Sequence, residues 1–206
     1  MSLDTTNIRF FEKEEKTFIA GDRTFNFPEP DTTGDNHLVV PFGLRISQDK
    51  EFMTVQLDPS QCDLFLKMEE NLLEKLKTQS PEFMTGMKRF RSVLYGDSNN
   101  LVTFRISDRV SWNFYNIKKA CFEKGKKEQV LPGSKVCVSF VISHPWSSNN
   151  GNYGFNLFLN EVIVYNIGER AVTEKPKSLK EQLEAQSKKR KRIMQFKEQD
   201  EDEDED

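Results

Sequence analysis

Residues 58–76 read DPSQCDLFLKMEENLLEKL, the stretch of this chain with the clearest helical period. Asp58 or Ser60 can cap the N-terminus of a helix here, and Pro81 lies where the helix should end. The apolar residues that recur at helical spacing are Leu64, Phe65, Met68, Leu72, Leu73 and Leu76. The pattern predicts one helix of about eighteen residues whose apolar stripe packs on a sheet.

Short runs with the period of a β-strand lie on both sides of this helix. In residues 101–107, Val102 and Phe104 alternate with Thr103 and Arg105, so the two sets point to opposite faces. The other predicted strands are residues 37–46 and 52–57, which are joined by the turn 47–51, and residues 110–117, 136–142 and 153–167. Short strands, one inserted helix and glycine-marked turns predict a mainly β fold, an OB-fold-like five-stranded barrel. A β-sandwich is the alternative.

The predicted organisation is one domain with an appendage at each end. Residues 1–35 form N-terminal strands and a turn-rich connector, residues 36–170 form the barrel domain, and residues 171–206 form a charged helix and an acidic tail. The N-terminal strands are anchored by Phe10, Phe11, Phe18, Phe25 and Phe27. A helix over residues 177–196 would have too narrow an apolar stripe to be held firmly.

Charge is segregated along the chain, although the net charge of its 206 residues is only −3. Residues 88–127 hold ten Lys or Arg against three acidic residues, which gives a local charge of +7. A polyanion responds to that local field rather than to the sum over the chain. The alternative to a binding surface is that these lysines are ordinary solvent-exposed residues of a loop.

The end of the chain carries the opposite charge and is predicted to stay disordered, because its carboxylates repel one another. The eight carboxylates are Glu198, Asp200, Glu201, Asp202, Glu203, Asp204, Glu205 and Asp206. Such a run can compete with nucleic acid for a cationic groove, recruit protein partners, or simply raise solubility. The basic cluster Lys188–Arg192 just before it has three interpretations: a nuclear-import signal, an extra phosphate contact, or a neutralising neighbour of the tail.

Catalysis has little support in the sequence. His37 and His144 have no spaced Cys, His or acidic partner, and the three cysteines form no zinc pattern. Phosphate-loop, zinc-protease, nucleophile-elbow and dinucleotide motifs are absent from the sequence. We therefore expect a protein that is not an enzyme and needs no metal or cofactor. The unpaired cysteines, of which Cys62 and Cys137 lie in apolar patterns, and the lack of a signal peptide predict an intracellular protein.

Binding has more support, because aromatic residues lie among cations in three places. Trp112 and Tyr115 are flanked by Arg109, Lys118 and Lys119, and similar mixtures surround residues 88–91 and 146–155. An exposed ring beside cations stacks on bases while the cations hold phosphates. Trp112, Trp146 and Tyr153 are predicted to be exposed, and Phe90, Phe104 and Phe114 to be core.

The layout resembles a known family. The features that carry the resemblance follow one another along the chain. They are an early hairpin, a helix opened by Asp58-Pro59, the strand 103–105, the segment Gly133-Ser134-Lys135-Val136, a strand ending near Pro145-Trp146 and an acidic terminus. This order resembles the replicative single-stranded DNA-binding proteins of tailed phages and large DNA viruses, over about residues 36–170 and the tail. The resemblance implies an OB barrel that binds single-stranded DNA, and an acidic tail that contacts polymerase and helicase–primase. It also allows a homodimer.

The residues and the resemblance together give fourteen candidate nucleic-acid-binding residues: Lys88, Arg89, Arg91, Arg105, Arg109, Trp112, Tyr115, Lys118, Lys119, Lys124, Lys126, Lys127, Trp146 and Tyr153. Two features depart from the phage pattern: the chain ends in Asp206 instead of an aromatic residue, and the cluster Lys188–Arg192 is foreign to it. The cluster allows a location in the nucleus or at a viral replication site.

The predicted function is to coat and protect single-stranded DNA in replication, recombination or repair. A histone- or replication-factor-binding adaptor and an RNA-binding protein of the same fold are the alternatives.

Overall fold

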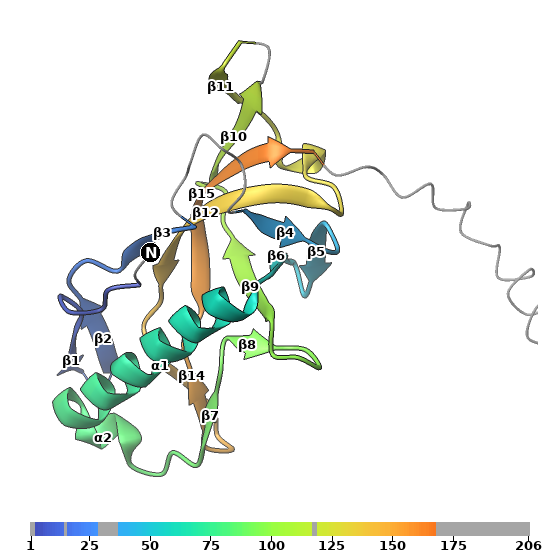
Figure 1. Ribbon diagram of the computed structural model, residues 1–206. Helices are drawn as coiled ribbons and strands as arrows, with labels where there is room; N and C mark the ends of the chain where they lie inside the picture. The colour runs from blue at the N-terminus through green and yellow to red at the C-terminus, as the bar shows by residue number, and fades with distance from the viewer. Residues whose placement is uncertain (1–2, 15, 29–36, 117–118, 168–206) are drawn as a thin grey trace, which may run out of the picture. The chain divides into compact units, whose positions relative to one another are not determined.

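A computed structural model describes residues 3–14, 16–28, 37–116 and 119–167 (Figure 1). The N-terminal half contains β1 (Arg9–Lys13), β2 (Lys16–Ala20), β3 (Thr24–Phe27), β4 (Leu38–Val40), β5 (Leu44–Ser47), β6 (Lys50–Gln56), α1 (Pro59–Gln79) and α2 (Pro81–Met84). The remainder contains β7 (Arg89–Arg91), β8 (Leu94–Tyr95), β9 (Leu101–Ile106), β10 (Ser111–Asn116), β11 (Cys121–Lys124), the 3₁₀ turn η1 (Lys127–Gln129), β12 (Ser134–Ile142), β13 (Trp146–Ser147), β14 (Asn152–Gly154) and β15 (Leu157–Asn166).

Five of the strands close into a barrel. They follow one another in the order β15, β12, β4, β6 and β9, and β9 then pairs with β15 in parallel, where Phe104 lies opposite Leu157. Closure of the sheet on itself confirms the predicted OB-like barrel and rules out the β-sandwich. The inserted helix α1 lies across the barrel strands in Figure 1.

Helix α1 begins where the sequence predicts. The Asp58 carboxylate accepts the N–H of Gln61 at 2.9 Å, and the Gln61 side chain accepts the N–H of Asp58 at 3.0 Å, which forms a capping box. The buried stripe of the helix consists of Gln61, Phe65, Met68, Glu69, Leu72 and Leu76. Leu64 and Leu73 are only half-buried, so they flank this stripe rather than form it.

The hairpin of β5 and β6 turns on two residues. Gln48 and Asp49 have φ values of 49° and 59°, in the left-handed region that such a two-residue turn requires. The turn fixes the register, so that Ser47 lies opposite Lys50 and Arg45 lies opposite Phe52. This confirms the hairpin predicted around residues 47–51.

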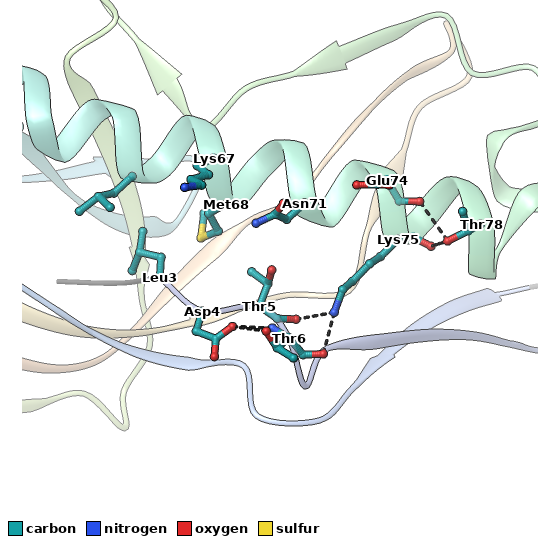
Figure 2. A pocket seen from close by; sticks show the side chains of 11 residues that line it. Leu3, Asp4, Thr5, Thr6, Lys67, Met68, Asn71, Glu74, Lys75 and Thr78 are labelled. Atoms are coloured by element: carbon teal, nitrogen blue, oxygen red, sulfur yellow. Dashed lines mark hydrogen bonds between the residues drawn. The ribbon is translucent and has the colours of Figure 1, made fainter.

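Two side chains of α1 hold the N-terminal part of the chain: Lys75 binds three carbonyl oxygens, and the Gln79 side chain accepts the N–H of Phe10 at 2.7 Å. The Nζ of Lys75 donates to the carbonyl oxygens of Thr5, Thr6 and Ile8, at 2.6, 2.7 and 3.1 Å. Figure 2 shows the Lys75 side chain reaching from the helix to Thr5 and Thr6 beside a cavity of about 570 Å³. The first β-hairpin therefore starts from a fixed position on the helix.

Three predicted boundaries are wrong. The strand predicted over residues 37–46 is interrupted, because Gly43, with a φ of 67°, breaks it into β4 and β5. Residues 123–128 are rich in lysine, and their sequence predicts a loop, but they are partly strand, because β11 pairs with β10. The last strand begins at Leu157 instead of residue 153, since β14 leaves the barrel to pair with β7.

The helix predicted over residues 177–196, the basic cluster and the acidic tail lie outside the described residues. The three domain boundaries stay predictions. Within the described ranges, no helix is long and apolar enough to cross a membrane.

One carboxylate of α1 is buried. Glu69 is 4% exposed, and its two oxygens accept the N–H of Val93 at 2.6 Å and the hydroxyl of Ser92 at 2.7 Å. Burial raises the pKa of this carboxyl above its usual value, although both hydrogen bonds act in the opposite direction. Glu69 thus ties α1 to the segment that leads into β8 at the cost of burying a carboxyl group, and that cost is smallest when the group is protonated.

The raised pKa of Glu69 predicts a pH-dependent cost. The folded chain binds this proton more tightly than the unfolded chain, so the contribution of Glu69 to stability is greatest below pH ~4.5 and falls as pH rises through the folded pKa. The substitution Glu69→Gln keeps both hydrogen-bond partners without the charge. We expect the variant to have a higher urea midpoint than the wild type at pH 8, with the difference vanishing near pH ~4.5. A difference that does not change with pH would contradict the assignment.

Candidate nucleic-acid interface

Four residues form a row across the outer face of the barrel. Arg45 on β5 lies opposite Phe52 on β6, Phe52 lies opposite Arg105 on β9, and Arg105 lies opposite Phe158 on β15. Their chain neighbours Met53, Phe104 and Leu157 are buried in the core. Because side chains alternate along a strand, the four residues of the row face outward. We call Arg45, Phe52, Arg105 and Phe158 the aromatic–arginine row.

The guanidinium groups of the row lie against rings. The Cζ of Arg105 is 5.6 Å from the centre of the Phe158 ring, and the Cζ of Arg45 is 4.3 Å from the centre of the Phe42 ring. Such cation–π contacts hold a planar cation flat on a ring. Phe42 is 46% exposed and Phe52 is half-buried, so the surface offers rings and guanidinium planes side by side. Bases stack on both kinds of plane, and guanidinium groups also bind phosphate.

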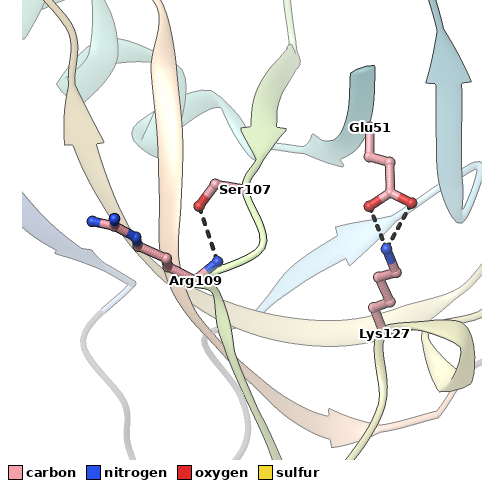
Figure 3. A network of polar contacts seen from close by, with 4 residues as sticks. All are labelled: Glu51, Ser107, Arg109 and Lys127. Atoms are coloured by element: carbon pink, nitrogen blue, oxygen red, sulfur yellow. Dashed lines mark hydrogen bonds and ion pairs between the residues drawn. The ribbon is translucent and has the colours of Figure 1, made fainter. Parts of the chain in front are cut away.

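A cavity of about 600 Å³ adjoins the row, and its lining includes Arg105, Phe158 and Lys127. Figure 3 shows the Glu51 carboxylate facing the Nζ of Lys127, at 2.7 Å from its Oε1 atom. The hydrogen bond to Glu51 is the main reason that the pKa of Lys127 is raised. The candidate Lys127 is therefore close to the row, but it already has an anionic partner.

Arg109 lies just beyond this cavity. Its backbone N–H reaches the Ser107 hydroxyl at 3.4 Å, and its side chain is exposed (Figure 3). Lys126 is also exposed, one residue before Lys127. Lys127 opens η1 and lines the cavity together with Arg105, while Arg109 and Lys126 lie in loops and are each next in sequence to a residue that lines it.

A second group of candidates lies on the hairpin of β10 and β11. Tyr115 contacts Phe122 and Tyr165, with ring centres 5.2 and 5.8 Å apart. Lys119 is paired with Glu123 at 2.7 Å, and that hydrogen bond raises the pKa of Lys119 and lowers that of Glu123. This surface is aromatic, but part of its positive charge is neutralised. Lys124 is exposed on the same hairpin, and Lys118 lies outside the described residues.

A third group lies on the small sheet of β13, β14 and β7. Arg89, Arg91 and Lys88 are exposed, and the Nε of Arg91 donates to the Asn152 side chain at 3.2 Å. The Trp146 ring packs on Gly154, where an added Cβ would stand 3.1 Å from Cζ2 of Trp146. The sheet thus brings together the sequence neighbourhoods of residues 88–91 and 146–155, as the aromatic–basic pattern suggested.

The predicted exposure of Tyr153 is wrong. Tyr153 is 8% exposed, because its ring packs against Phe83 and Phe90 beneath the small sheet. Trp112 and Trp146 are half-buried rather than exposed, and Trp112 packs against the core. A polar or basic neighbour in sequence points to the opposite face of a strand, so it does not indicate exposure of the ring itself.

Of the predicted core aromatics, Phe104 is confirmed and the other two are only partly buried. Phe104 is fully buried, and Phe90 and Phe114 are half-buried against the core.

No group of three or more His, Cys, Asp or Glu residues that could hold a metal ion occurs in residues 3–14, 16–28, 37–116 and 119–167.

Sequence reasoning missed three of the four residues of the row, Arg45, Phe52 and Phe158, together with Phe42. A signal was present for Phe52 and Phe158, since each alternates with a buried apolar neighbour in a predicted strand, but Arg45 lies between the half-buried Leu44 and the exposed Ile46. What the sequence could not supply was the register that sets Phe52 and Phe158 on either side of Arg105.

The sequence matches no protein-family model and no curated protein. Among solved structures, the single-stranded DNA-binding protein gp2.5 of bacteriophage T7 is 12% identical with a TM-score of 0.45, and the match covers 74% of this chain and 91% of the phage chain. The chain is structurally similar to phage single-stranded DNA-binding proteins.

The same class of protein from bacteriophage Enc34 is 11% identical with a TM-score of 0.42, over 82% of this chain and 94% of that chain. Its structure in complex with single-stranded DNA gives 13% identity, a TM-score of 0.44, and coverage of 81% and 99%. A likeness at these identities concerns the fold, and a fold does not by itself determine function.

The pairs Lys127–Glu51 and Lys119–Glu123 allow an experiment to distinguish binding at the aromatic–arginine row from binding at the β10–β11 hairpin. The substitution Glu51→Gln adds one positive charge and releases Lys127 beside the aromatic–arginine row. If the row binds nucleic acid, oligo-dT affinity should rise, and the slope of log K against log salt should steepen by about one. Fluorescence anisotropy of labelled oligo-dT at several salt concentrations measures both.

The substitution Glu123→Gln is the matched control, because it releases Lys119 from an equivalent pair on the hairpin of β10 and β11. We expect the oligo-dT affinity and the salt slope of this variant to change much less than those of Glu51→Gln. A steeper slope in Glu123→Gln and none in Glu51→Gln would move the interface to the β10–β11 hairpin.

Proposed function

We propose that this protein binds single-stranded DNA without catalysing a reaction, and that it coats and protects the strand in replication, recombination or repair. The observation that carries the proposal is the aromatic–arginine row. The row presents two phenylalanine rings and two guanidinium groups in alternation across four neighbouring strands.

The spacing of the row suits an extended strand. Neighbouring β-strands are about 4.8 Å apart, so the four residues extend over roughly 14 Å of surface. Rings stack on unpaired bases, and arginines bind the phosphates between them. Stacking is available only to bases that are not paired in a duplex. Base identity matters little to stacking, so the row is suited to sequence-independent binding of single strands.

The fold supports the same surface. In OB-fold proteins, oligonucleotides bind on the face of the second and third barrel strands and on the loops beside it. Here β6 and β9 are those strands, and they carry Phe52 and Arg105. The similar T7 and Enc34 proteins are described as single-stranded DNA-binding proteins, one of them in complex with single-stranded DNA.

The fourteen sequence candidates enter this proposal with different roles. Arg105 belongs to the row, and Arg109, Lys126 and Lys127 lie near it as phosphate contacts. The candidates on the two other surfaces, which would extend the contact, are Lys88, Arg89, Arg91, Trp112, Tyr115, Lys118, Lys119, Lys124, Trp146 and Tyr153. Tyr153 supports Phe90 from beneath instead of meeting a base.

The acidic tail completes the proposal as a regulator and a recruiting segment. Its eight carboxylates imitate a polyanion and compete with DNA for the row, and they bind a polymerase and a helicase–primase when DNA displaces them. The family resemblance described above supports this division of roles.

The proposal is tested at Phe52. The substitution Phe52→Ala removes one stacking plane and should weaken oligo-dT binding by about 1–3 kcal/mol, or roughly 5- to 150-fold in Kd. Phe52→Trp should retain binding, and oligo-dT should quench the added fluorescence beyond the background of Trp112 and Trp146. Leu66→Ala, which removes an exposed apolar side chain from α1, is the control and should leave binding unchanged.

Two results would contradict the proposal that the ligand is single-stranded DNA. If the wild-type protein does not bind oligo-dT at low salt, the adaptor reading takes its place. If it binds oligo-U better than oligo-dT, the ligand is RNA.

The role of the tail is tested by neutralising it at constant length. A variant with the eight carboxylates of residues 198–206 changed to Asn or Gln should bind oligo-dT more tightly than the wild type. The gain should be largest at low salt, because salt screens the competing tail. Equal affinities at low and moderate salt would show that the tail does not compete.

A further inference from the structure

The hairpin of β1 and β2 has an outward face of cations and rings. Arg9 lies opposite Ala20, Phe11 opposite Phe18, and Lys13 opposite Lys16. The intervening residues Phe10 and Ile19 are buried, which places these three pairs on the outer side of the hairpin. We call Arg9, Phe11, Lys13, Lys16 and Phe18 the hairpin face.

The rings of the hairpin face are held in place. Phe11 stacks on Phe18 with ring centres 5.6 Å apart and planes inclined by 20°, and Phe11 is 44% exposed. Phe18 in turn meets the His144 ring edge-on at 5.2 Å. The exposed ring therefore has a fixed orientation, as a stacking surface requires.

The His144 side chain also anchors the hairpin by a hydrogen bond to the hairpin's backbone. Its Nδ1 atom accepts the N–H of Ile19 at 3.0 Å. Burial lowers the pKa of His144, and the nearby charge of Arg23 lowers it further. The imidazole therefore remains neutral at physiological pH and keeps Nδ1 free to accept this bond. His144 lies on the segment between β12 and β13, so the hairpin is tied to the barrel at its outer edge.

The outer surface of the barrel continues from the aromatic–arginine row toward this hairpin. Phe158 lies opposite Val141 on β12, and Val141 lies opposite Thr24 on β3. Val141 is half-buried between two buried neighbours, and Thr24 is exposed, so both face outward. Arg23, adjacent to Thr24, lies close enough to His144 to affect its pKa. A continuous exterior path thus joins β5, β6, β9, β15, β12 and β3 to the hairpin.

We propose that the hairpin face is a second contact for the same single strand, reached by DNA that has crossed the barrel over Phe158, Val141 and Thr24. This inference rests on the proposed function and adds a longer path to it. Phe11 and Phe18 supply the stacking surface there, and Arg9, Lys13 and Lys16 supply the phosphate contacts. Acidic residues also lie on this hairpin. Glu12 alternates to the opposite face with Phe10, and Glu15 follows Glu14 in the sequence. Glu14 lies 3.9 Å from Lys13 in a pair that is mostly exposed to solvent and therefore weak.

Strand length provides the test. From β5 to β3 the path crosses five strand-to-strand steps, or roughly 24 Å, before it reaches the hairpin. An oligo-dT of about 5 nucleotides can occupy the row alone, whereas one of about 20 nucleotides can reach both surfaces. The triple substitution Phe11→Ala, Lys13→Ala and Lys16→Ala removes the hairpin contact from an exposed surface.

We expect the triple variant to bind the short oligo-dT like the wild type and the long one about five- to tenfold more weakly. Its salt slope should also become shallower for the long strand alone, by about 1.4, because two phosphate contacts are lost. Saturation of poly-dT should need more protein per nucleotide. The control variant Leu66→Ala, Lys67→Ala and Lys77→Ala removes one exposed apolar residue and two exposed lysines from α1, and it should match the wild type throughout.

The outcomes separate the two proposals. If Phe52→Ala weakens binding to both lengths while the hairpin variant binds both like the wild type, the hairpin inference is wrong and the proposed function stands. An equal loss at both lengths, in a variant with an unchanged thermal unfolding midpoint, would also overturn the extended path. If wild-type protein binds neither length, the proposed function itself fails.

Discussion

The fold depends on the packing of one aromatic side chain, Phe140, inside the barrel. The ring of Phe140 on β12 lies 5.4 Å from Phe25 on β3, 5.8 Å from Phe65 on α1 and 5.2 Å from Phe104 on β9. Opposite walls of the barrel and the inserted helix thus meet at one side chain. Aromatic pairs of this kind add about 0.5–1.5 kcal/mol each beyond the apolar area that they bury.

The same contact determines what the outer surface can present. Phe104 points inward to Phe140, so Arg105 must point outward, and its cross-strand neighbours Phe52 and Phe158 follow the same alternation. A shift of one residue in any of these strands would exchange core and surface. The aromatic–arginine row is therefore a consequence of core packing, and its geometry is as rigid as the barrel.

The sequence predicted what local physics controls. The capping residue Asp58, the helix, the β5–β6 hairpin and the alternation of residues 101–107 were all correct, because each depends on neighbours in the chain. The exposure of Tyr153 was wrong because it depends on Phe83 and Phe90, which are distant in sequence. The row went unnoticed because it needs the register between β6, β9 and β15. Charge counting had the same limit: Lys119 and Lys127 look free in sequence, but both are paired in the fold.

The contact of Lys75 with the N-terminal segment has an evolutionary consequence. Lys75 binds three carbonyl oxygens, a group that every residue type provides, so the attachment itself places no demand on the side chains of residues 5, 6 and 8, although burial constrains Thr5 and Ile8 separately. The attachment depends on side chains of α1, namely Lys75 and Gln79, which accepts the N–H of Phe10, rather than on side chains of the segment that it holds. Substitutions on the outer side of the hairpin can therefore alter what the hairpin binds without detaching it from the helix.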